Sequence, residues 1–180
     1  PERPEEPTQL FVLELGGGEP WPLATLPHGI TSFAWDPSGG RVAIVAPADP
    51  PRFLVGKAPS GGSPTARRID RLDWRLDGVG ILDRRGQLWV GSAREGTRFR
   101  QVTRGDYDVR DPSWSPDGST IAFTSDRMPD SDLHPRSTIW AVVATGGTAR
   151  EVLALGGYAH SPAYSPDGRW LAAVGVAEST

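Results

Sequence analysis

The chain has no cysteine, one lysine and one methionine among its 180 residues. Without cysteine it can form neither disulfide bonds nor thiolate metal sites. No apolar run approaches the roughly 18–20 residues that a membrane-spanning helix needs. The first residues have neither the basic start nor the apolar core of a secretion signal. Because the sequence also does not begin with methionine, we expect a piece of a longer protein.

Excess charge of one sign is missing as well. The formal net charge is -3 and the pI is near 5.6. A dedicated polyanion-binding protein concentrates basic residues and has a high pI. We therefore expect no nucleic-acid partner, and the lack of an apolar span leads us to expect no membrane partner.

The motifs of common catalytic and metal sites are also missing. No serine has glycine two residues before and two after it, so the G-x-S-x-G nucleophile elbow is absent. The three histidines, at positions 28, 134 and 160, lack the spacing of metal-binding pairs. Asp130, Asp132 and His134 alternate and have the chemistry to hold a cation, but a solvated polar loop is the favoured interpretation. We predict no catalytic, cofactor-binding or metal-binding residue, and no cofactor.

Other suggestive patterns have ordinary structural explanations. Gly16-Gly17-Gly18 is not followed by the Lys-Ser/Thr of a phosphate loop, so we interpret it as a hairpin turn. Arg98, Arg100 and Arg104 are followed at once by aspartates and indicate a solvated strand face. The recurring aspartates each belong to a turn of their own: Asp77, Asp117 and Asp167. Four tryptophans are expected to be packing residues: Trp35, Trp74, Trp114 and Trp140.

What the chain does contain is one short phrase in four copies. An aromatic residue, a turn sequence and an apolar run recur, clearly in two copies and with more substitutions in two others: 114–118, 164–168, 35–39 and 74–78. The aromatic positions are separated by 39, 40 and 50 residues. About 40 residues is the length of one four-stranded propeller blade. The repeat predicts an all-β propeller.

The clearest copy predicts the layout of a blade. In 115–118, proline presets φ at the second turn position and glycine tolerates positive φ, so a tight hairpin should join inner strand a to strand b. A β-branched run then forms strand c, and outer strand d follows the turn at Gly146-Gly147. Strands are predicted over 10–15, 41–46, 87–92, 98–103, 120–125, 138–143 and 170–175. Segment 51–70 should be irregular.

The two ends of the chain each predict half a blade. Residues 9–25 read as a c–d pair and 163–176 as an a–b pair. We therefore expect a leading loop over 1–8, a partial propeller of three full blades and two half-blades over 9–176, and a tail over 177–180. A closed ring of four blades and an open arc of a larger propeller are both possible, since the two halves are complementary.

The loops divide between two faces. Short a–b and c–d turns belong to one face, and the b–c and d–a loops belong to the other. The second face should receive 47–52, 104–110, 126–137 and 156–160, of which 126–137 is the longest and most charged. We predict that this loop face is the contact surface.

Two longer stretches narrow the family. The repeats are similar to many WD-type propellers, TolB-like ones included. Residues 68–89, and 101–133 apart from the intervening turn and Met128, resemble the blades of prolyl oligopeptidase family serine peptidases, of the acylaminoacyl-peptidase branch. The resemblance runs from about residue 8 to 175, and it favours the larger propeller.

That resemblance implies a seven-bladed or similar propeller that caps an α/β-hydrolase domain and admits only oligopeptides. The family's serine, aspartate and histidine lie in the hydrolase domain, and no position here matches them. The implied partners are the rest of the propeller, the hydrolase domain and peptide substrates, in the cytoplasm. The alternative is a self-contained TolB-like propeller that serves as a protein–protein interaction scaffold, in the periplasm.

Overall fold

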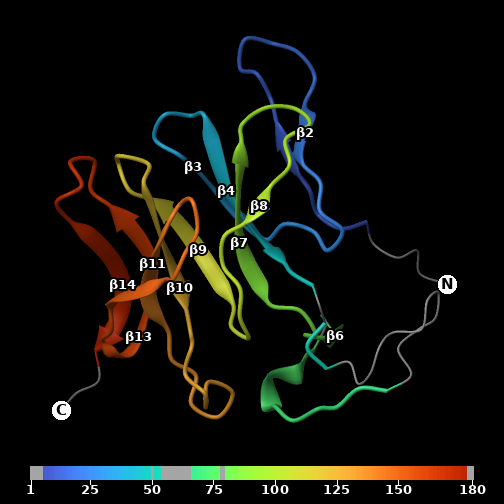
Figure 1. The fold of residues 1–180 in the computed structure, drawn as a ribbon, viewed down its shortest axis with the longest axis vertical. Helices are drawn as coiled ribbons and strands as arrows, with labels where there is room; N and C mark the ends of the chain where they lie inside the picture. Colours follow the sequence, from blue (N-terminus) through green and yellow to red (C-terminus); the bar gives the residue numbers. More distant parts are fainter. Residues whose placement is uncertain (1–5, 50, 54–65, 78–79, 178–180) are drawn as a thin grey trace.

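The computed structural model describes residues 6–49, 51–53, 66–77 and 80–177. Within these ranges fourteen strands form five antiparallel sheets, and the single helix is a 3-10 turn, η1 (Leu72–Trp74). The predicted all-β fold is confirmed, and Figure 1 shows the sheets side by side. The described helix is far too short to cross a membrane.

The first complete blade follows chain order from its inner to its outer strand. It consists of β3 (Ser32–Trp35), β4 (Arg41–Pro47), β7 (Gly86–Ser92) and β8 (Arg100–Gln101), hydrogen-bonded in that sequence. Residues 42–45 of β4 are all buried, so this sheet is covered on both faces. A stack of such sheets is the layering of a propeller.

The second complete blade repeats this plan. It consists of β9 (Val109–Trp114), β10 (Thr120–Ser125), β11 (Thr138–Val143) and β12 (Arg150–Leu153), again in chain order. The fold is a partial β-propeller. The strands predicted over 41–46, 87–92, 120–125 and 138–143 are confirmed. The outer strand expected over 98–103 is reduced to the two residues of β8, and the strand expected over 10–15 ends at Val12.

The predicted count of three full blades is wrong, because the described residues form two four-stranded sheets. The phrase at 74–78 does not begin a blade: β4 pairs along its whole length with β7, from Arg41 opposite Ser92 to Pro47 opposite Gly86. The residues between them form a b–c connection that contains η1 and a small hairpin of β5 (Arg75–Leu76) and β6 (Gly80–Ile81). The apolar run after this phrase contains Gly80 and is followed at once by Asp83-Arg84-Arg85, whereas the runs after the other copies continue without a charged residue. Most of 51–70, predicted to be irregular, lies outside the described residues.

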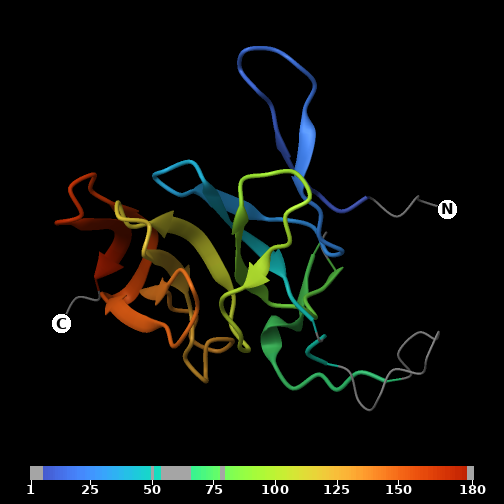
Figure 2. The same cartoon turned by 45° about the horizontal axis from the view of Figure 1, so that its top comes forward.

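Half-blades flank the two complete blades, as predicted. β1 (Leu10–Val12) pairs with β2 (Trp21–Ala24) at one end, and β13 (Gly156–Tyr164) pairs with β14 (Leu171–Ala177) at the other. Figure 2 shows them on opposite sides of the molecule. Among the described residues no sheet combines β1 with β14, so the four-bladed closed ring is not formed.

The hairpin turns form as their local chemistry predicts. In the turn after Trp114, Gly118 N donates to Ser115 O at 2.8 Å, and Gly118 has φ +66°. The turn after Tyr164 has the same bond from Gly168 to Ser165. Positive φ is free of steric cost only for glycine, which explains why the phrase ends on this residue.

Three apolar clusters fill the spaces between neighbouring sheets. The largest lies between the two complete blades and includes Val45, Leu88, Ile121, Phe123 and Trp114. Trp114 is 6% exposed, which confirms its predicted burial. The other two clusters join each half-blade to its neighbouring complete blade.

Candidate functional site

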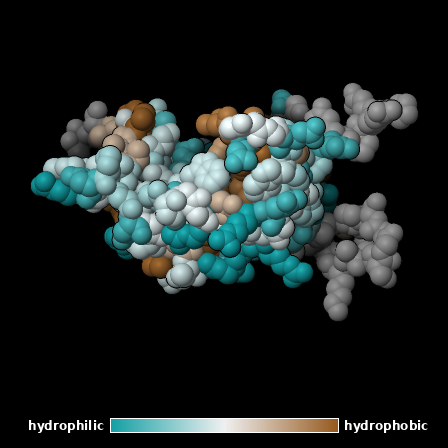
Figure 3. Space-filling model, turned by 90° about the horizontal axis from the view of Figure 1, so that it is seen from above, coloured by the Kyte–Doolittle hydropathy of each residue, from teal (hydrophilic) through white to brown (hydrophobic). Residues whose placement is uncertain are grey.

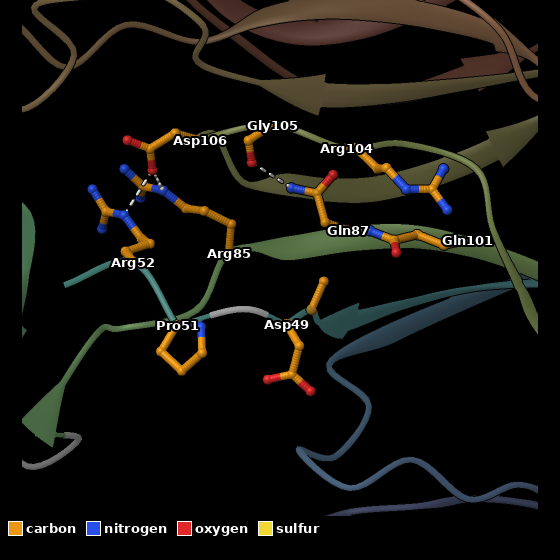
Figure 4. A pocket seen from close by; sticks show the side chains of 10 residues that line it. Asp49, Pro51, Arg52, Arg85, Gln87, Gln101, Arg104, Gly105 and Asp106 are labelled. Carbon is orange, nitrogen blue, oxygen red and sulfur yellow. Dashed lines mark hydrogen bonds and ion pairs between the residues drawn. The ribbon is translucent and has the colours of Figure 1, made fainter. Parts of the chain in front are cut away.

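The loop face holds a cavity of about 470 Å³. The loop after β4, the start of β7 and the segment after β8 surround it, two of which were predicted to share this face. Its lining consists of Ala48, Asp49, Pro51, Arg52, Arg85, Gln87, Gln101, Arg104, Gly105 and Asp106 (Figure 4). Figure 3 looks onto the opposite, turn face, where separate hydrophobic patches interrupt a largely hydrophilic surface. Residues 156–160, predicted as a loop, instead begin β13.

A buried glutamine holds one wall of this cavity. The Gln87 side chain donates from Nε2 to the carbonyls of Gly105 (3.2 Å) and Tyr107 (2.7 Å), and its Oε1 accepts from Thr103 Oγ1 at 2.8 Å. All of these groups are therefore satisfied within the protein, and burying them costs little. Gln87 fixes the segment that carries Asp106 relative to β7.

Arg85 is the centre of the charge network beside the cavity. Its Nε, Nη1 and Nη2 lie 2.9, 2.8 and 2.8 Å from carboxylate oxygens of Asp106, Asp108 and Asp73, respectively. The Arg85 side chain is 10% exposed. Burial opposes its charge, but the carboxylates of Asp108, Asp106 and Asp73 outweigh that effect and raise the pKa of Arg85.

Arg52 adds a second cation to the same carboxylates. Its Nε lies 2.7 Å from Asp106 Oδ1, as a charge contact that is not aligned as a hydrogen bond, and its Nη2 lies 3.4 Å from Asp73 Oδ1. Burial alone would raise the pKa values of Asp73 and Asp106. The hydrogen bonds and charges of Arg85 and Arg52 outweigh burial and hold both pKa values below the ordinary range.

The longest loop joins the network through Arg71. This side chain donates from Nη2 to Ser131 Oγ at 2.7 Å, and Leu72 N donates to Asp132 Oδ2 at 2.9 Å. A second cavity of about 240 Å³ lies beside the first, and Arg85 lines both. Loop 126–137 and the b–c connection of the first blade therefore meet on the loop face.

This arrangement is built to hold a shape rather than to carry out chemistry. Asp132 bonds to Arg71 and Leu72, and Asp130 lies 3.4 Å from Arg136, so neither joins His134 in a cation site. Within the described ranges no group of three or more histidine, aspartate or glutamate residues is placed to hold a metal ion.

His160 and Ser161 are in contact, but this contact belongs to a repeated bulge. His160 Nδ1 lies 3.0 Å from Ser161 Oγ, and Ser161 has φ +53°. Asp111, at the equivalent place in β9, has φ +49°. Both positions coincide with register shifts in the inner strands. A conformation that recurs at the same blade position is a structural device rather than an activated nucleophile.

Sequence reasoning missed the network. Asp106 and Asp108 were interpreted only as the charges that follow Arg98, Arg100 and Arg104 on a solvated strand face, and Arg85 and Asp73 were not singled out. The places of these residues in the blades could have indicated the network. Arg85 directly precedes strand c, and Asp106 and Asp108 lie just before strand a of the next blade, so all three belong to the loop face.

Comparisons with known proteins point to two kinds of propeller-containing protein. No protein-family model matches the chain. The uncharacterized peptidase YuxL of Bacillus subtilis (strain 168) is 25% identical over 135 residues, which cover 73% of this chain and 20% of YuxL. The Tol-Pal system protein TolB of Bordetella pertussis is 31% identical over 129 residues, which cover 66% of this chain and 30% of TolB. The chain resembles a TolB-like propeller.

Among solved structures, TolB from Acinetobacter baumannii superposes with a TM-score of 0.43 and 17% identity, over 96% of this chain and 44% of that one. The chain thus spans between a fifth and a third of the length of the curated relatives described above. The propeller assignment itself rests on the blade topology.

Proposed function

We propose that this chain is the non-catalytic β-propeller portion of a serine peptidase of the prolyl oligopeptidase family. In this role it restricts the entry of oligopeptides to an α/β-hydrolase domain that lies elsewhere in the protein. The observation that supports the proposal most is the alignment with YuxL, which runs through 73% of this chain and only 20% of a protein named a peptidase.

The loop-face network gives the proposal a physical basis. The segments that resemble the acylaminoacyl-peptidase branch contribute both of its sides: Asp73 and Arg85 come from 68–89, and Asp106 and Asp108 come from 101–133. Loops cross-linked by charge-assisted hydrogen bonds keep a fixed separation. A rim of this kind passes an extended peptide and excludes a folded domain.

The test compares the full-length gene product with this chain alone. We expect a fluorophosphonate probe to label the full-length product and not the isolated chain, which should also leave N-acetylated peptides intact, since covalent catalysis needs an activated serine–base pair. In the full-length protein, Arg85→Met should raise the ratio of the cleavage rate of a folded protein to that of an acylated dipeptide, compared with the unmodified protein. Arg98→Met is the matched control, because Arg98 is exposed on the same blade. An unlabelled, inactive full-length product would contradict the proposal.

The alternative is a self-contained TolB-like propeller that serves as a protein–protein interaction scaffold. The higher identity to Bordetella pertussis TolB favours it. It places the protein in the periplasm, whereas the peptidase proposal places it in the cytoplasm, so cell fractionation distinguishes the two. Periplasmic location without fluorophosphonate labelling would support the scaffold.

A further inference from the structure

Trp35 and Trp114 occupy the same position in successive blades. Each ends an inner strand, and each stands opposite the residue seven places later, which is Val42 for Trp35 and Ile121 for Trp114. Their exposures nevertheless differ, at 45% for Trp35 and 6% for Trp114. At this repeated position, Trp114 is therefore covered by the preceding blade, whereas Trp35 is left partly uncovered.

The surroundings of Trp114 show what covers a tryptophan at this position. Trp114 Nε1 donates to the carbonyl of Ala34 at 3.1 Å, and Arg41 Cζ lies 4.7 Å from the indole centroid. Arg41 is itself positioned by Asp36, at 2.8 Å from Nε to Oδ2, and it donates to the Gly118 carbonyl at 2.7 Å. Ala34 and Arg41 belong to strands a and b of the preceding blade.

The partly exposed tryptophan, Trp35, faces the β1–β2 half-blade, which has no a or b strand among the described residues. Trp35 and Phe33 stand opposite Val42 and Ile44, which pack with residues of β2. Residues opposite each other on antiparallel strands share a face. Trp35 and Phe33 therefore point to the β1–β2 side, yet Phe33 remains 51% exposed. In the described chain, β1 pairs on one edge only.

The third inner strand shows how the contact varies. Tyr164 takes the tryptophan position in β13, and Thr120 takes the place of Arg41 at the start of the preceding strand b. In the described structure, strand b begins with arginine (Arg41) where the inner strand of the following blade ends on tryptophan (Trp114). It begins with threonine (Thr120) where that inner strand ends on tyrosine (Tyr164). An indole is the better partner for a cation.

We propose that the Phe33–Trp35 face and the free edge of β1 together receive the a–b strand pair of a further blade. Its inner strand accepts a hydrogen bond from Trp35 Nε1, and its second strand begins with arginine or lysine over the indole and pairs with β1. This inference rests on the proposed function, because the resemblance to the prolyl oligopeptidase family implies a propeller with more blades than this chain contains, and it does not depend on peptidase activity.

The experiment supplies the missing strands in cis. A copy of residues 31–47 is joined to the amino end of the full chain through a Gly/Ser linker of about ten residues, which reaches roughly 17 Å. We expect backbone amides on the free edge of β1 to exchange with solvent about tenfold more slowly, and the unfolding midpoint to rise. In this extended chain, Trp35→Ala, or Arg→Gln at the copy's equivalent of Arg41, should remove most of the gain.

The matched controls are Trp35→Ala in the unextended chain and Trp170→Ala in both chains. None of them should move the unfolding midpoint much, since Trp35 is 45% exposed without the added strands and Trp170 is 69% exposed. A gain that survives Trp35→Ala, or no protection at β1, would overturn the inference. Concentration-dependent protection of β1 in the unextended chain would also overturn it, since a second copy would then be the occupant. Loss of peptidase labelling in the full-length product would leave the inference standing.

Discussion

The guanidinium of Arg127 lies over the ring of Tyr107, with Cζ 3.8 Å from the ring centroid. Trp140 contributes a second ring at 4.1 Å. Arg127 Nε and Nη2 are buried, and they have no hydrogen-bond partner among the described residues. Burial lowers the pKa of Arg127, with a smaller opposing effect of Tyr107. The side chain therefore contributes more through packing than through charge.

Replacing Arg127 with methionine should accordingly cost less than replacing it with alanine. Methionine keeps the contact with the rings and removes a buried charge that lacks an acidic partner, so the free energy of unfolding should change by less than about 1 kcal/mol. Alanine should lose about 1–3 kcal/mol through the cavity it leaves. Urea denaturation of both variants tests this. Equal losses would show that the charge itself stabilises the fold.

Trp114 should be the most sensitive of the repeated aromatic residues. Trp114→Ala should lower the free energy of unfolding by about 3–5 kcal/mol, since it opens a cavity between the complete blades. Trp114→Phe keeps most of the packing and should cost about 1 kcal/mol for the hydrogen bond to Ala34, plus a smaller packing loss. Thermal unfolding, with Trp170→Ala as the exposed control, measures both. An unchanged melting temperature for Trp114→Ala would contradict the buried placement.

Stability should fall in acid through the loop-face carboxylates. The pKa values of Asp73 and Asp106 are lowered in the folded protein, so their contribution is present above the unfolded pKa of about 3.9 and is lost as pH falls below it. Arg85→Met removes the main cause and should flatten this part of the curve. Unfolding measured from pH 6 to about pH 2 tests the sign. An equally steep acid limb in Arg85→Met would contradict it.

The bulge in β13 should tolerate glycine and reject a β-branched residue. Ser161 has φ +53°, a region where L side chains cost about 1–2 kcal/mol. Ser161→Val should destabilise by roughly that amount, because a β-branched side chain is the poorest fit there. Ser161→Gly should stay within about 0.5 kcal/mol, as relief of strain offsets added chain entropy. The comparison needs only thermal unfolding. A tolerated valine would show that the bulge can rearrange.

The local parts of the fold followed from the sequence alone. The four-residue turn that ends at Gly118 needs a positive φ at its last position, and glycine at that position adopts it without steric cost. The burial of Trp114 was predicted from its place before an apolar run, but Trp35 at the same place is 45% exposed, so the neighbouring blade decides how far the repeated aromatic residue is covered. Short-range steric and hydrophobic preferences act before any distant contact forms.

Strand partners and side-chain partners were decided by the tertiary structure. The phrase at Trp74 has the local chemistry of a blade, yet β4 pairs with β7 and leaves Trp74 in a connection. No local pattern pairs Arg85 with Asp73, and only the folded loops bring their side chains to 2.8 Å. Pairing across tens of residues depends on which surfaces can be buried together, and a local pattern cannot specify that choice.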